Sequence, residues 1–200
     1  MKPTVLTLAL LIASPAVAAP ATLDDVRASL KATTTMTASF IQTAANGGVL
    51  TGKLLLARPG RIRFQYDRAP LLVVADGKRL SVVDYEVGQV SQWPIRSTPL
   101  GVLLDADADL ARFARVSGQV ANATEVEARD PRRPEFGAIT LTFAADASAP
   151  GGLTLSGWTV LDAQHNRTTI ALRDVRYNVE IARSSFGFRD PRTRAVPGKN

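Results

Sequence analysis

Few side chains in this sequence could perform covalent catalysis. The chain has no cysteine, and its single histidine, His165, stands in the polar stretch 162–167. A serine hydrolase triad would have to use that histidine, and no Gly-x-Ser-x-Gly motif is present to carry the nucleophile. The pattern favours a turn position for His165. We therefore expect a protein that is not an enzyme.

One acidic run has spacing that resembles a metal site. Asp105, Asp107 and Asp109 are spaced like the start of a calcium loop. The sixth position of that loop would be Leu110 instead of glycine, and the twelfth Val116 instead of glutamate. The remaining candidate carboxylates show no spacing that singles out a catalytic pair: Glu86, Glu125, Glu127, Glu135 and Glu180. The sequence predicts no metal and no cofactor.

The charged residue that stands out is Arg58, because it continues an apolar strand face. Side chains alternate between the two faces of a strand, so Arg58 shares its face with Leu54 and Leu56. The Pro-Gly pair at 59–60 ends that strand, and the next strand carries on one face Ile62, Phe64 and Tyr66. This predicts a β-hairpin with a broad apolar face and one guanidinium at its edge. The alternative is an ordinary half-buried hairpin with Arg58 in solvent.

The elements around this hairpin are predicted from caps and turn signals. A helix is expected from Thr22 to about Lys31, because Thr22 and Asp25 form a capping box. A strand follows, with one face made by Met36, Ala38 and Phe40, and a turn at 46–48. After the hairpin, short apolar runs separated by turns are typical of an antiparallel meander. The predicted strands span 71–75, 80–85, 89–95, 116–120, 124–128, 138–144, 153–161, 168–175 and 177–181.

The stretch 97–104 departs from the strand pattern. Ser97-Thr98-Pro99 is a helix start with proline at the first helical position. Three leucines then lie on one side of the expected helix: Leu100, Leu103 and Leu104. A short helix this apolar must cover an apolar surface, either as part of the core or as a lid.

Length and composition indicate one exported domain. The 200 residues suggest a single domain. Residues 1–18 have the pattern of a signal peptide, with cleavage expected near Ala18, so that 19–200 would form the mature protein. Because cysteine is absent, a bacterial lipid anchor has no acceptor. The formal net charge of +6 lacks the basic stripe with interleaved aromatic residues that nucleic-acid binding requires.

Four stretches together resemble the periplasmic outer-membrane lipoprotein carrier family, LolA. They are the hairpin 52–66, the run Asp76-Gly77-Lys78 with 80–84, the segment Thr98-Pro99-Leu100 with Leu103-Leu104, and the region from Gly157-Trp158-Thr159-Val160 through Asp162-Ala163-Gln164 to Asp190-Pro191. Each is weak alone, but their order and spacing cover most of the mature chain. The Arg-rich stretch near Arg132 and the C-terminal tail depart from the family pattern.

The resemblance implies a mainly β fold with short helices, an unclosed antiparallel β-barrel capped by a helical lid. It implies a monomeric periplasmic carrier that takes acylated lipoproteins from an inner-membrane ABC-type release complex to an outer-membrane acceptor, or to the outer membrane itself. The family's functional arginine, which bonds to the lid and holds the empty cavity shut, corresponds to Arg58. The lid corresponds to 99–104.

A carrier of this kind needs an apolar cavity and no catalytic group. One long acyl chain gains roughly 10 kcal/mol on leaving water, so an acylated protein cannot cross an aqueous gap unaided. The residues we expect to line the cavity are Leu54, Leu56, Ile62, Phe64, Tyr66, Trp93, Leu100, Leu103 and Leu104. For each of them plain barrel core is the alternative. A general lipid-binding or lipoprotein-sensing protein in the same fold is the rival function.

Overall fold

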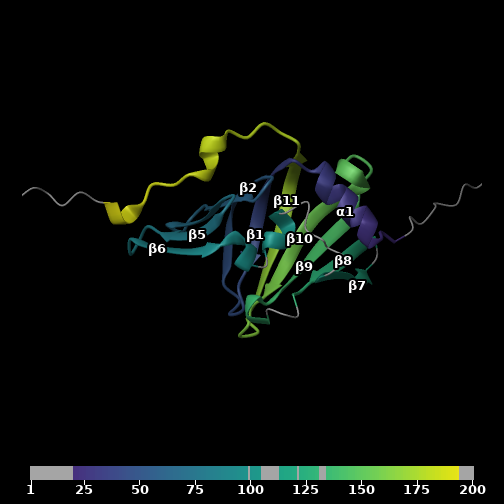
Figure 1. The fold of residues 1–200 in the computed structure, drawn as a ribbon, viewed down its shortest axis with the longest axis horizontal. Coiled ribbons are helices and arrows are strands. Elements are labelled where there is room, and N and C mark those ends of the chain that lie inside the picture. Colours follow the sequence, from purple (N-terminus) through teal and green to yellow (C-terminus); the bar gives the residue numbers. More distant parts are fainter. Residues whose placement is uncertain (1–19, 99, 105–112, 121, 131–133, 194–200) are drawn as a thin grey trace, which may run out of the picture.

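The computed structural model describes residues 20–98, 100–104, 113–120, 122–130 and 134–193. The predicted signal peptide 1–18 with its cleavage site, Pro99, the aspartate run 105–109 and the stretch at Arg132 lie outside the described residues. Figure 1 shows a strongly curved sheet with a helix across one end of its inner side and an extended C-terminal segment along its outer side.

The elements follow one another with short connections. The helices and 3-10 turns are α1 (Leu23–Ala32), η1 (Ile95–Ser97), α2 (Leu100–Leu104), η2 (Pro134–Phe136), η3 (Pro150–Gly152), η4 (Arg183–Phe186) and η5 (Pro191–Thr193). The strands are β1 (Thr35–Thr43), β2 (Val49–Ala57), β3 (Arg61–Tyr66), β4 (Leu71–Asp76), β5 (Arg79–Asp84), β6 (Gln89–Pro94), β7 (Ala114–Val120), β8 (Ala123–Ala128), β9 (Ala138–Ala145), β10 (Leu153–Leu161) and β11 (Arg167–Tyr177).

All eleven strands form one antiparallel sheet in the order β6-β5-β4-β3-β2-β1-β11-β10-β9-β8-β7. Two consecutive meanders are joined where β1 pairs with β11. Among the described strands, β6 and β7 each have a single hydrogen-bonded neighbour, so the sheet curves without closing. The predicted fold, a mainly β unclosed antiparallel barrel with short helices, is confirmed.

Helix α1 begins at the predicted capping box. The Thr22 hydroxyl accepts a hydrogen bond from the Asp25 amide, and the Asp25 carboxylate accepts one from the Thr22 amide. These contacts satisfy two amides that a helix start otherwise leaves without partners. The helix buries Val26 and Leu30 against the inner side of the sheet, and the Ser29 hydroxyl donates to the Leu153 carbonyl of β10. We call this side of the sheet the inner face.

The β2–β3 hairpin has the predicted register and faces. Leu54 pairs with Phe64 and Leu56 with Ile62, and all four side chains are buried in the inner-face cluster. The chain turns at residues 58–60, which we call the corner. Gly60 has a φ of +72°, and a Cβ there would lie 2.8 Å from the Gly77 Cα in the β4–β5 turn. The corner therefore packs tightly against its neighbouring turn.

The outer face of the same strands carries a second, smaller cluster. Its buried members are Ala57, Leu72, Val74, Val83 and Phe186. Phe186 comes from the C-terminal segment 178–193, which we call the strap. Figure 1 shows the strap in yellow, beside the outer side of the β2 to β5 region. Alternation along β2 to β5 thus supplies two apolar faces, each with its own cover.

The final strand corrects one prediction. The sequence pattern predicted separate strands at 168–175 and 177–181, but β11 is a single strand that ends at Tyr177. The pairing with β1 shifts register near Asp174, which has a φ of +53°. A bulge of this kind breaks the period of two and imitates a strand end. The chain leaves the sheet at Asn178, whose side chain accepts from the Thr34 amide and donates to the Ala32 carbonyl.

Candidate functional site

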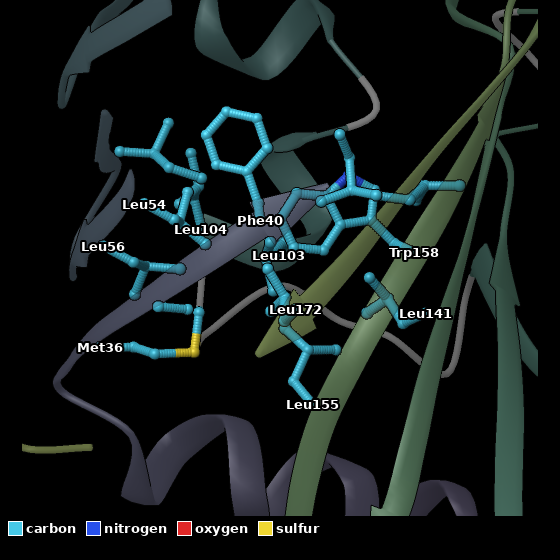
Figure 2. Close-up of a cluster of buried hydrophobic side chains, with 14 of the residues drawn as sticks. Met36, Phe40, Leu54, Leu56, Leu103, Leu104, Leu141, Leu155, Trp158 and Leu172 are labelled. Atoms are coloured by element: carbon cyan, nitrogen blue, oxygen red, sulfur yellow. The ribbon is translucent and has the colours of Figure 1, made fainter. Parts of the chain in front are cut away.

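The inner face of the curved sheet is an almost continuous apolar surface. Five residues predicted to line a cavity are 0–6% exposed there: Leu54, Leu56, Ile62, Phe64 and Tyr66. Further residues of the same cluster come from the preceding strand β1 and from the distant strands β9 to β11, among them Met36, Phe40, Leu141, Leu155, Trp158 and Leu172 (Figure 2). Their side chains point to one interior because the antiparallel pairing matches the alternation of each strand with that of its neighbour.

Helix α2 fills this interior with its leucines. Leu103 and Leu104 are each 1% exposed, and Leu100 is half-buried against the same cluster. Figure 2 shows Leu103 and Leu104 among the inner-face side chains, close to the labelled Phe40 and Leu54. The short apolar helix therefore covers the inner face, and its own leucines occupy the space that a bound apolar group would need.

Arg58 joins the two helices that cover the inner face. Its Nη1 donates to the Thr33 carbonyl at the C-terminal end of α1, at 2.6 Å, and its Nη2 donates to the Leu103 carbonyl of α2, at 2.7 Å. The Gly60 amide adds a bond to the Leu104 carbonyl at 3.2 Å. The last carbonyls of a helix have no partner within the helix, and an arginine fork can serve two of them at once.

The interior beside Arg58 is nearly full. A cavity of about 10 Å³ lies between α1, α2 and the sheet. It is lined by Ser29, Leu30, Thr33, Met36, Leu56, Arg58, Leu103, Phe143, Leu155 and Tyr177. A cavity of this size holds at most one water molecule. An acyl chain can enter this part of the interior only if α2, α1 or both move.

Four aromatic rings fill the middle of the inner face. Phe40 meets Phe64 and Tyr66 edge-on, with ring centroids 5.3 and 5.2 Å apart, and Phe64 meets Trp158 at 6.0 Å. The Tyr66 hydroxyl donates to the Gln42 side-chain oxygen at 2.7 Å. Burial disfavours the charged phenolate and raises the pKa of Tyr66 to about 12. The one phenol of this aromatic group is thus neutral and hydrogen-bonded at physiological pH.

Sequence reasoning missed Phe40 and Trp158 as residues of this site. Phe40 belonged to a predicted strand face, and Trp158 to a stretch that resembled the family. Nothing local indicated that they would meet the hairpin residue Phe64. Trp158 reaches Phe64 only through the central pairing of β1 with β11, which brings the two meanders into one sheet. Phe40 reaches it through the consecutive pairings of β1 with β2 and of β2 with β3.

Trp93, also predicted to line the cavity, lies at the margin of the inner face. It lies in the edge strand β6 and is 47% exposed. It pairs with Leu80, which belongs to the inner-face cluster, so its side of the sheet is the expected one. An edge strand has a neighbour on one side only, and Trp93 therefore lies at the margin of the inner face and outside its buried cluster.

Two further observations concern chemistry and membranes. His165 is exposed in the turn between β10 and β11, as predicted. Among the described residues no group of three histidine, cysteine, aspartate or glutamate side chains is arranged to hold a metal ion. In the same part of the chain, no helix has the length and apolar character needed to cross a membrane. The best-defined site in the described residues is the covered apolar interior.

Comparisons with known proteins identify the family of this chain. Residues 31–189 match the family described as "Outer membrane lipoprotein carrier protein LolA". An outer-membrane lipoprotein carrier protein of Chromohalobacter salexigens is 30% identical over 182 residues, which cover 84% of this chain and 82% of the relative. One of Chromobacterium violaceum is 28% identical, with 96% of each chain covered.

Among solved structures, a LolA superfamily protein from Nitrosomonas europaea aligns with 84% of this chain and 98% of its own, with a TM-score of 0.45 and 8% identity. The family match spans the sheet from β1 to β11, both sides of the corner and most of the strap. The chain therefore belongs to the LolA family of outer membrane lipoprotein carrier proteins.

Proposed function

We propose that this protein carries lipoproteins by enclosing their acyl chains between the inner face of the sheet and a lid formed by α2, with Arg58 as the latch of that lid. The carrier role follows from the family to which the chain belongs. The residues proposed to contact acyl chains are Leu54, Leu56, Ile62, Phe64, Tyr66, Leu100, Leu103 and Leu104, joined by Phe40 and Trp158.

The observation that carries the proposal is the pair of bonds from Arg58. A buried apolar cluster alone would be ordinary core. Here part of its cover is the short helix α2, whose end is held by side-chain and backbone donors from the corner. Such a cover can move without breaking the hydrogen bonds between strands, and its removal uncovers an apolar surface large enough for hydrocarbon.

The magnitudes favour a latch that cargo can open. A hydrogen bond from a charged donor contributes about 1.5–3 kcal/mol, so the two Arg58 bonds amount to a few kcal/mol. Transfer of one long acyl chain from water gains roughly 10 kcal/mol. Because the acyl term is larger, a bound chain can keep the lid open. When the acyl chain leaves, the lid closes and its leucines return to the interior. This closure favours complete release of the cargo and leaves the carrier ready for another cycle.

The remaining parts of the proposal concern subcellular localisation and partners. We place the protein in the periplasm after cleavage near Ala18, as a monomer that works without catalysis, cofactor or nucleic acid. It would receive acylated lipoproteins from an inner-membrane ABC-type release complex and deliver them to an outer-membrane acceptor or to the outer membrane itself. The family's role as a carrier to the outer membrane supports this direction of transport.

The proposal is tested by recovering the mature protein gently from its native periplasm and identifying bound molecules by mass spectrometry. The comparison is between the native chain, Arg58→Leu and the control Arg63→Leu. Arg63 lies five residues away on the outer face and bonds to the strap instead of the lid. We expect acylated lipoproteins to accumulate on Arg58→Leu, because the lid no longer closes to expel them.

Two results would contradict the proposal. Free fatty acid or phospholipid bound without any lipoprotein would indicate a general lipid shuttle. Normal delivery of lipoproteins by Arg58→Leu, with no accumulation, would show that Arg58 is not the latch.

A further inference from the structure

The corner at 58–60 contacts the lid and the connection between α1 and β1. Towards the lid, the Arg58 side chain and the Gly60 amide donate to the carbonyls of Leu103 and Leu104. The Arg58 amide donates to the Thr34 carbonyl at 2.9 Å, directly after the pair of Thr35 with Ala57 that ends the β1–β2 ladder. The position of this short turn thus decides whether the latch arginine reaches its acceptors.

Arg61 holds the corner from outside. Its Nη2 donates to the backbone carbonyl of Arg58 at 3.2 Å. The same guanidinium lies over the ring of Phe186, with its central carbon 5.6 Å from the ring centroid. Phe186 is 4% exposed and is the strap's contribution to the outer-face cluster. One side chain therefore contacts the strap and the latch residue's backbone together.

The neighbouring outward arginine makes a different set of contacts. Arg63 lies two residues further along β3 on the same face, and its Nη1 donates to the strap carbonyls of Ser185 and Gly187 at 3.2 and 2.9 Å. Its Nη2 donates to the Gln65 side chain. Arg63 thus fastens the strap to the sheet, and its hydrogen bonds do not reach the corner.

We infer that Arg61 is a positioning residue that links the C-terminal strap to the Arg58 latch. Phe186 fixes the Arg61 guanidinium against the outer face, and Arg61 fixes the Arg58 carbonyl. The corner is thereby held where the Arg58 side chain reaches α2. A partner that displaced the strap would release Arg61, loosen the corner and favour opening of the lid. This inference rests on the proposed latch role of Arg58.

The contrast between Arg61 and Arg63 provides the test. The probe is a 16-carbon fatty acid that bears an environment-sensitive fluorophore, titrated into the purified mature protein. We expect Arg61→Met to bind the probe about tenfold more tightly than the native chain. Loss of one hydrogen bond from a charged donor shifts the equilibrium between closed and open lid by about this factor. Arg63→Met leaves Arg61 with both the Phe186 ring and the Arg58 carbonyl, and it should change binding less than about twofold. Unchanged resistance of this variant to chymotrypsin at Phe186 and Phe188 shows that the strap is still in place.

A double variant separates positioning from general loosening. If Arg61 acts through Arg58, Arg58→Leu/Arg61→Met should bind the probe no more tightly than Arg58→Leu alone. Additive effects in the double variant would overturn the inference, because Arg61 would then act by another route. Arg61→Lys, which keeps a donor and a cation over the ring, should restore part of the native affinity.

The outcomes also distinguish the two proposals. Unchanged probe binding by Arg58→Leu would refute the latch itself. If Arg58→Leu binds the probe more tightly but Arg61→Met and Arg63→Met bind it equally well, the latch role of Arg58 is supported and the positioning role of Arg61 is refuted.

Discussion

The two faces of strands β2 to β5 are both apolar, yet they are covered in different ways. The inner-face cluster includes residues from strands on both sides of the β1–β11 pair, and its cover is α1 with the short α2. The outer-face cluster is small, and its cover is the strap, anchored by one buried ring, Phe186. Both covers are fastened by hydrogen bonds from an arginine side chain to backbone carbonyls: Arg58 bonds to the inner cover and Arg63 to the outer cover.

The two covers differ in whether a ligand can replace them. Removing α2 uncovers a broad apolar interior that hydrocarbon can refill, so the lost contacts are replaced. Removing the strap uncovers a few side chains on a convex surface, where water is the substitute. We therefore expect the inner cover to open for cargo and the outer cover to control the corner.

Truncation of the largest rings should separate the two faces most clearly. Phe40→Ala, at a site 1% exposed in the aromatic group, should lower the free energy of unfolding by about 3–5 kcal/mol. Phe186→Ala should cost less, because the strap can detach locally while the sheet stays folded. Urea unfolding of both variants measures the losses. Equal losses would mean that the strap belongs to the cooperative core.

Alkaline pH should act on the inner face through Tyr66. Burial raises the pKa of Tyr66 to about 12 in the folded protein, against about 10 in an unfolded chain. The stability that the neutral phenol contributes is complete below pH 10 and is lost as the pH rises towards 12. The native chain should lose about 2–3 kcal/mol more than Tyr66→Phe across that window.

Tyrosinate absorbance and denaturant unfolding at several pH values measure the Tyr66 effect. A phenol that titrates near pH 10 in the folded protein, with no stability difference from Tyr66→Phe, would show that the inner face is open to water.

Loss of the α1 cap should affect stability but not the lid. Thr22→Ala removes the hydroxyl that accepts from the Asp25 amide and should cost about 1 kcal/mol in unfolding free energy. The latch bond to α1 is at the opposite end of the helix, at Thr33. Binding of the fluorescent fatty acid should therefore stay unchanged. A marked gain in binding would show that α1 moves as part of the lid.

Trp93→Phe should have the smallest effect on stability, and it tests whether the edge of the sheet belongs to the binding surface. Because Trp93 is 47% exposed at the sheet edge, we expect unfolding free energy to change by less than about 0.5 kcal/mol. The variant leaves Trp158 as the single tryptophan. Its emission should respond to an added acyl chain. If the native chain responds to the acyl chain and Trp93→Phe does not, the binding surface lies at the edge of the sheet.

Local signals in the sequence predicted much of this fold. The capping box lies within four residues, and the faces of β2 and β3 follow from alternation within each strand. The β11 prediction was wrong because a bulge at Asp174 breaks that alternation. Trp93 was assigned to the correct side of its strand, but its exposure depends on β6 being an edge, which strand order decides.

The site was predictable only in part, because its contacts span long stretches of chain. Alternation within a few residues shows that Arg58 stands at the end of an apolar strand face. Its bonded carbonyls at Thr33 and Leu103 lie 25 and 45 residues away, and Ser185, on the strap, lies 122 residues from Arg63.

Which residues share a face, where the chain turns and where α1 begins could all be read from the sequence, because they depend on the backbone period and on neighbours within a few positions. Which face lies inside, what covers each face and which carbonyls the arginines bond to became known only from the folded chain. Those choices depend on the pairing of β1 with β11 and on segments that meet only after the sheet has formed.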